Sequence, residues 1–106
     1  MRKRFLVKGT LSETKLREAL DPIIMGIDKT THKTVYRTSK GIVEYVSIPI
    51  RSSPGRYASV GVSDTLRKIL LWHRKSTNEL EETLRSNTIN MIEIIKDGPT
   101  TLELKK

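Results

Sequence analysis

The chain has 106 residues, of which 36% are hydrophobic and 30% charged, and a formal net charge of +8. This composition excludes a disordered chain and predicts a single domain, residues 1–106, with one aliphatic core. Cysteine is absent, which excludes disulfides and thiolate chemistry and favours a reducing, cytoplasmic compartment. The sequence also lacks an apolar run near the roughly 20 residues that cross a bilayer, so we expect no membrane partner.

The N-terminal part predicts a basic segment, a strand and a helix. Residues 1–4 are rich in Arg and Lys, and we expect a mobile basic arm there. A short strand over 4–8 places Phe5 and Val7 on one face. Thr10 or Ser12 then caps a helix over 12–20, which ends at Asp21-Pro22 because the residue before proline avoids the α region. The sequence pattern of the apolar stretch 23–27 does not indicate whether it is a helix or a strand.

The middle of the chain alternates with a period of two, which is typical of strands. We predict an antiparallel meander of three strands over 34–38, 42–50 and 57–62, with turns at 39–41 and 53–56. In the second strand the pattern assigns one set of side chains to the core: Ile42, Val46, Ile48 and Ile50. It assigns the other set to a wetter face: Val43, Tyr45, Ser47 and Arg51.

The C-terminal part predicts two helices followed by a hairpin. The helices cover 64–75 and 77–86, with one continuous helix as the alternative, and Ser76 with Glu79 matches the capping-box spacing. The hairpin pairs 90–96 with 101–105 around Asp97-Gly98-Pro99. The predicted fold is therefore α+β: a mainly antiparallel sheet, made of the central meander and the C-terminal hairpin, with two or three helices packed on one face.

The Lys and Arg residues are concentrated in the N-terminal part of the chain, which is predicted to form most of the sheet. Residues 1–62 carry 12 Lys and Arg against 5 Asp and Glu, whereas residues 63–106 carry 8 against 7. The same part holds all three tyrosines. Cationic side chains beside flat aromatic rings suit nucleic acid, because the cations hold phosphates and the rings stack on bases. The competing interpretation is that the charge serves solubility and that tyrosine is a good strand former.

We therefore expect a small non-catalytic nucleic-acid-binding protein, with single-stranded DNA or RNA favoured over duplex. The residues expected to contact phosphate are Arg2, Lys3, Arg4, Lys40, Arg51 and Arg56. Tyr45 and Tyr57 are expected to stack on bases. A homodimer is plausible, because an edge strand from a second chain is easily added to a sheet of this size.

Catalysis has little support in the sequence. His32 and His73 are far apart and match no triad or metal spacing, and the chain lacks a Gly-rich phosphate loop. We expect no enzyme activity, no cofactor and no metal, with a nuclease as a distant alternative. The main alternative is a protein-interaction module, such as a viral or accessory factor that binds an acidic host protein.

Two short segments resemble known DNA-binding families. Residues 59–66 lead into a predicted basic helix and then a capped second helix, which resembles a ribbon-helix-helix repressor. Lys40-Gly41 with Ile48-Pro49-Ile50-Arg51 is similar to the pattern of swapped-hairpin transition-state regulators. Both resemblances imply only DNA binding, and with it the further alternative of a dimeric transcriptional regulator.

Overall fold

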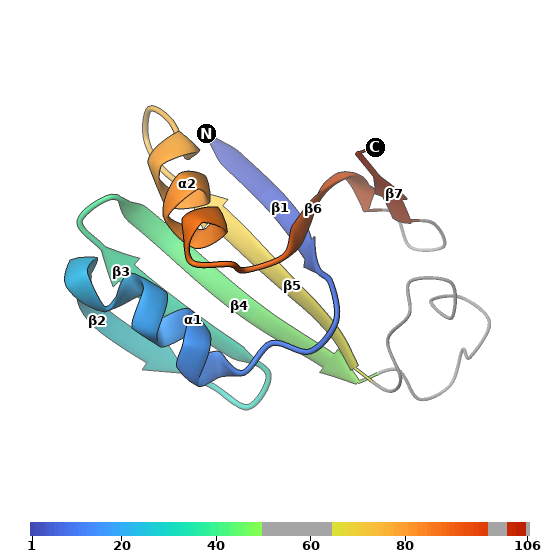
Figure 1. Cartoon of the computed structure of the whole chain (residues 1–106), viewed down its shortest axis with the longest axis horizontal. Helices are drawn as coiled ribbons and strands as arrows, with labels where there is room; N and C mark the ends of the chain where they lie inside the picture. The colour runs from blue at the N-terminus through green and yellow to red at the C-terminus, as the bar shows by residue number, and fades with distance from the viewer. Residues whose placement is uncertain (50–64, 98–101, 106) are drawn as a thin grey trace.

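The computed structural model describes residues 1–49, 65–97 and 102–105. Within these ranges, seven antiparallel strands form one sheet in the order β2-β3-β4-β5-β1-β6-β7, with two α-helices (Figure 1). The strands are β1 Arg2–Val7, β2 Ile24–Lys29, β3 Lys33–Thr38, β4 Gly41–Pro49, β5 Thr65–Trp72, β6 Met91–Asp97 and β7 Leu102–Leu104. The helices are α1 Glu13–Leu20 and α2 Asn78–Ser86, with a 3₁₀ turn at Asp21–Ile23 after α1. The expected α+β class and mainly antiparallel sheet are confirmed.

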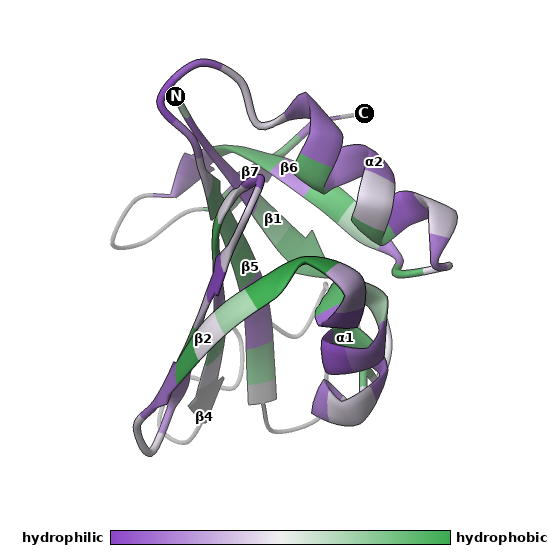
Figure 2. Ribbon diagram, turned by 90° about the vertical axis from the view of Figure 1, so that its left-hand side faces the viewer, coloured by the Kyte–Doolittle hydropathy of each residue, from purple (hydrophilic) through white to green (hydrophobic). Residues whose placement is uncertain are grey.

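The main core lies between the sheet and the two helices, which cover the same face (Figure 2). Leu16 and Leu20 of α1, and Leu80 and Leu84 of α2, are fully buried. They stand one helical turn apart in each helix, so each helix presents one apolar stripe to the sheet. Burial of each such side chain stabilises the fold by roughly 1.5–3 kcal/mol.

A second, smaller cluster lies apart from the main core, at β6 and β7. Leu6, Leu66 and Ile94 are buried there, and Leu102 and Leu104 pack against them. The C-terminal hairpin, whose strands match the prediction within about a residue, thus shields residues of β1 and β5.

Several local predictions are confirmed. Ser12 is the N-cap of α1, and its Oγ accepts a hydrogen bond from the Lys15 N–H at 3.3 Å. The helix predicted over 77–86 is α2. The apolar stretch 23–27, for which the sequence predicted no secondary structure, contributes most of β2, which pairs with β3.

The helix predicted over 64–75 is wrong, because Thr65–Trp72 forms strand β5. Leu66, Ile69 and Leu70 have helical spacing, but the segment lies between β4 and β1 and pairs with both. Both faces of β5 are covered. Ile69 and Leu71 are buried in the main core on the helix side, and Leu66 is buried in the second cluster on the opposite side. Such a strand carries apolar residues on both faces, so its pattern also fits a helix. The loss of this helix removes the basis of the ribbon-helix-helix resemblance.

The two faces of β4 are the reverse of the prediction. Val43 and Tyr45 are buried under the helices, whereas Ile42 and Val46 are partly exposed on the opposite face. Both sets are apolar enough to be buried, and the position of the helices decides between them. The third predicted strand, 57–62, lies outside the described residues, and the strand next to β4 is β5.

Residues 2–4 belong to strand β1 and do not form the expected arm. β1 lies inside the sheet, paired with β5 on one side and with β6 on the other. None of the helices in the described ranges is long and apolar enough to span a membrane.

Candidate nucleic-acid interface

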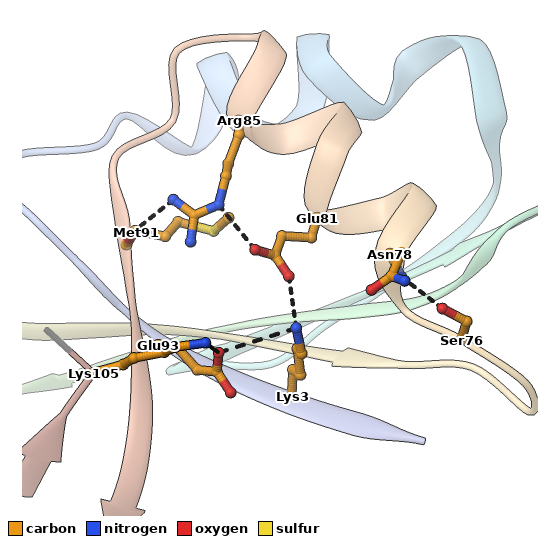
Figure 3. Close-up of polar contacts among 8 residues, drawn as sticks. All are labelled: Lys3, Ser76, Asn78, Glu81, Arg85, Met91, Glu93 and Lys105. Carbon is orange, nitrogen blue, oxygen red and sulfur yellow. Dashed lines mark hydrogen bonds and ion pairs between the residues drawn. The ribbon is translucent and has the colours of Figure 1, made fainter.

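The three cations of β1 point to two different faces of the sheet. Arg2 pairs across the sheet with Trp72, and Arg4 pairs with Leu70, on the face away from the helices. Lys3 points to the helix side, where its Nζ lies 3.1 Å from Glu81 Oε1 and 4.0 Å from Glu93 Oε1 (Figure 3). The alternation of a strand therefore brings Arg2 and Arg4 together and separates Lys3 from them.

The other predicted phosphate contacts are dispersed. Lys40 lies in the turn between β3 and β4, and its Nζ is 3.5 Å from Glu79 Oε2 of α2. Arg51, Arg56 and the stacking candidate Tyr57 lie outside the described residues.

Tyr45 is not available for stacking. It is 6% exposed and belongs to the main core, and Tyr36 is 1% exposed. The Tyr36 hydroxyl donates a hydrogen bond to Glu13 Oε2 at 2.7 Å, which joins β3 to the first turn of α1. Burial, followed by this hydrogen bond, raises the pKa of Tyr36 above its ordinary range. Burial also raises the pKa of Tyr45, although Arg67 opposes this. The expectation of an exposed tyrosine face is therefore wrong for Tyr36 and Tyr45.

An exposed aromatic side chain is present at a different position, Trp72, which is 42% exposed. The strand registers align Arg37 with Ile42, Ile42 with Trp72, and Trp72 with Arg2. Directly opposed residues share a face of the sheet and lie close enough to contact each other. The helix-free face therefore carries a row in which an apolar centre, Ile42 and Trp72, is flanked by two guanidinium groups.

Two hollows adjoin Trp72, and both are lined by Ile42 and Trp72. The first has a volume of about 240 Å³ and lies on the sheet face, where Arg2, Glu44 and Leu70 complete much of its wall. The second has a volume of about 480 Å³ and lies at the end of the sheet. Its remaining wall comes from the β3–β4 turn and from the segment after β5: Thr38, Ser39, Gly41, His73, Arg74 and Lys75.

The segment after β5 is held in place by His73. Its Nδ1 accepts hydrogen bonds from the backbone N–H groups of Lys75 at 2.9 Å and Ser76 at 3.1 Å. Its own backbone N–H donates to the Met1 carbonyl at 3.0 Å. These contacts fix the backbone from which the exposed side chains of Arg74 and Lys75 extend beside the second hollow.

The charges around Trp72 are mainly positive. We define the Trp72 site by the residues Arg2, Ile42, Leu70, Trp72, Arg74 and Lys75. Among the described carboxylates, none lies within 4.0 Å of the cationic groups of Arg2, Arg74 or Lys75. Glu44 is the only described carboxylate that lines either hollow, and its Oε1 is 2.8 Å from Lys33 Nζ.

The opposite side of the sheet holds a second group of charges, which are paired with each other. Glu81 of α2 contacts Lys3 and accepts a hydrogen bond from Arg85 Nε at 3.0 Å, and Glu93 lies 3.8 Å from Lys105 (Figure 3). Arg85 also donates to the Met91 carbonyl and lies over the Phe5 ring. This network attaches α2 to β1 and β6.

Trp72, Arg74 and Lys75 were not among the predicted site residues. They lie in the segment 64–75, which was predicted to be a helix. With strand spacing, Trp72 instead shares its face with Leu70 and Lys68, and Arg74 and Lys75 follow the strand end. The segment 65–72 has no clear two-residue period, so its pattern gave no signal that distinguished a strand from a helix.

Comparison of the chain with protein-family models, with curated proteins and with solved structures finds no match. In the parts of the chain that the structure describes, His, Asp and Glu side chains do not gather in a group of three that could hold a metal ion.

Proposed function

We propose that this protein binds single-stranded nucleic acid at the Trp72 site. The observation that carries the proposal is an exposed indole ring between two hollows that are lined by cations. An aromatic face stacks on any base, and the guanidinium and ammonium groups attract the phosphates that join the bases. Trp72 thus takes the role that the sequence suggested for tyrosine.

A single strand fits this surface better than a duplex. The Trp72 face is a sheet, and an indole ring on a sheet can stack only on bases that are not already paired and stacked. Both described helices are packed against the core, and the exposed side of α2 carries Glu79 and Glu82. These carboxylates repel phosphate, so nucleic acid approaches the sheet from the helix-free side.

The proposal is tested by fluorescence titration, because Trp72 is the only tryptophan of the chain. Short single-stranded oligonucleotides should quench its emission, and duplex of equal length should quench it less. Arg74→Gln/Lys75→Gln should reduce the slope of log K against log salt by about 1.4, since each phosphate contact on a single strand contributes about 0.7. Trp72→Leu, measured by gel shift, should weaken binding by about 1–3 kcal/mol.

The matched control is Lys15→Gln/Arg17→Gln, which removes the same charge from α1 on the other side of the sheet. We expect this variant to bind nearly as well as the wild type at moderate salt. Equal losses in the two double variants would mean that net charge alone drives binding, and the Trp72 site would then have no special role.

A second candidate function is binding of an acidic protein at the same face. The observation that favours it is that three apolar side chains of this face, Val35, Ile42 and Leu70, are partly exposed, since protein interfaces combine an apolar centre with a charged rim. An acidic protein partner would bind with defined stoichiometry and would not be displaced by oligonucleotide.

A homodimer remains a further proposal, with β2 as the strand that a second chain would extend. β2 is an outer strand of the sheet and pairs only with β3 among the described strands. A concentration-dependent mass in sedimentation would support the dimer.

A further inference from the structure

Glu44 is out of place on a surface that attracts phosphate. It lies at the centre of the helix-free face, aligned with Val35 on one side and Leu70 on the other. Its side chain is 29% exposed, and it lines the smaller hollow beside Trp72. A carboxylate here weakens the attraction of a polyanion, and among the described residues only Lys33 forms an ion pair with Glu44, through one of its two oxygens.

We infer that Glu44 selects nucleobases that carry an exocyclic amino group, so that the hollow beside Trp72 prefers cytosine to thymine or uracil. This inference rests on the proposed function, because it assigns the smaller hollow to a base and the larger one to the backbone phosphates. The smaller hollow, with Ile42, Leu70 and Trp72 in its wall, offers the apolar surface that a base covers. The larger hollow offers Arg74 and Lys75 to phosphate, beside the hydroxyl-bearing Ser39.

The direction of the preference follows from hydrogen-bond chemistry. Lys33 Nζ contacts Glu44 Oε1 at 2.8 Å, which orients the carboxylate, and no described ion pair uses Oε2 as an acceptor. The amino group of cytosine donates to a carboxylate, which is a recognised way to read this base. Thymine and uracil have a carbonyl oxygen at the position of this amino group, and that oxygen repels a carboxylate. The only donor on this edge of the base is the ring N–H, and it lies between two carbonyl oxygens that also repel the carboxylate.

The test compares oligo(dC) with oligo(dT) of equal length at a mildly alkaline pH, where cytosine is neutral and does not pair with itself. We expect the wild type to bind oligo(dC) about five- to tenfold more tightly, the effect of a single discriminating hydrogen bond. Glu44→Gln should reduce this ratio to below about twofold, because an amide both donates and accepts.

Two further variants separate recognition from charge. Asp28→Asn removes a carboxylate from the same sheet face, 3.3 Å from Arg37 Nε, without altering the hollow, so it should keep the preference for oligo(dC). Glu44→Asp keeps the charge but shortens the side chain, so it should lower the preference. Circular dichroism of each variant confirms that the fold is retained.

The outcomes distinguish this inference from the proposed function. Binding of oligo(dC) and oligo(dT) with equal affinity by the wild type would overturn the role of Glu44 and leave the Trp72 site intact. A preference that survives in Glu44→Gln would also overturn it. Failure of both oligonucleotides to quench Trp72 or to bind in a gel shift would instead reject the proposed function itself.

Discussion

At the scale of single residues, Gly41 connects the turn after β3 to the Trp72 site. Its φ of +132° lies in a region that residues with a side chain rarely adopt. A Cβ at this position would overlap the backbone carbonyl oxygen of Trp72 and would lie 2.9 Å from Leu80 Cδ1. Gly41 thereby allows the start of β4 to pass close to the end of β5, directly beside the proposed binding surface.

We expect Gly41→Ala to reduce the free energy of unfolding by about 2–3 kcal/mol, because it combines backbone strain with a clash against main chain. The matched control is Gly9→Ala. Gly9 also has a positive φ, of +72°, but a Cβ there meets no heavy atom within 4 Å. Its replacement should cost about 1 kcal/mol from strain alone. Urea denaturation measures both values, and equal losses would show that the close approach at Trp72 contributes nothing.

At the scale of elements, α2 is attached to the sheet by apolar contacts and by the charge network around Glu81. Burial alone would raise the pKa of the Glu81 carboxyl, but the hydrogen bonds from Arg85 and Lys3 outweigh it, so the pKa lies below its ordinary value of 4.5. A carboxyl whose pKa is lowered by folding stabilises the folded state when it is ionised. That stability is present above the unfolded pKa and is lost as the pH falls through the folded pKa.

Glu81→Gln should therefore lower the free energy of unfolding by about 1–2 kcal/mol at neutral pH. The difference from the wild type should shrink steadily as the pH falls below the ordinary pKa of the carboxyl. Glu82→Gln is the control, since Glu82 is the exposed neighbour on the same helix and forms no ion pair with a described residue. Thermal melts across the acid range measure the effect, and a constant difference between wild type and Glu81→Gln would contradict the ionic origin.

At the scale of the whole molecule, the strand made from the N-terminal residues holds the two parts of the sheet together. β1 pairs with β5 through five aligned residue pairs and with β6 through three. Phe5 and Val7 enter the main core, and Leu6 enters the second cluster. The segment therefore contributes to both cores and joins β6 and β7 to the rest of the sheet.

Deletion of residues 1–8 should abolish the cooperative thermal transition, whereas deletion of 102–106 should lower the melting temperature and leave a folded protein. The reason is that β1 is an internal strand with two partners and β7 is an outer strand with one among the described elements. Circular dichroism and amide hydrogen exchange of the two truncated chains provide the measurement. A cooperatively folded 1–8 deletion would contradict this role of β1.

The parts of this fold that depend on short segments were predictable. Ser12 caps α1 through its own side chain and the next few residues, and the C-terminal hairpin follows from the alternating residues of its two strands. The excess of positive charge is a property of composition, and so is the expectation of an anionic ligand. These features need no knowledge of which segments meet in space.

The parts that the sequence left open depend on burial on both faces. Residues 65–72 carry apolar side chains in a pattern that satisfies a helix and an internal strand, and pairing with β4 and β1 selects the strand. Val43 and Ile42 are equally apolar, and only the helices above β4 decide that Val43 is buried and Ile42 is not. The same position of the helices buries Tyr45 of β4 and leaves Trp72 of β5 exposed. Side chains alternate along a strand, so once the helices cover one face of the sheet, every residue is assigned either to the covered face or to the opposite one.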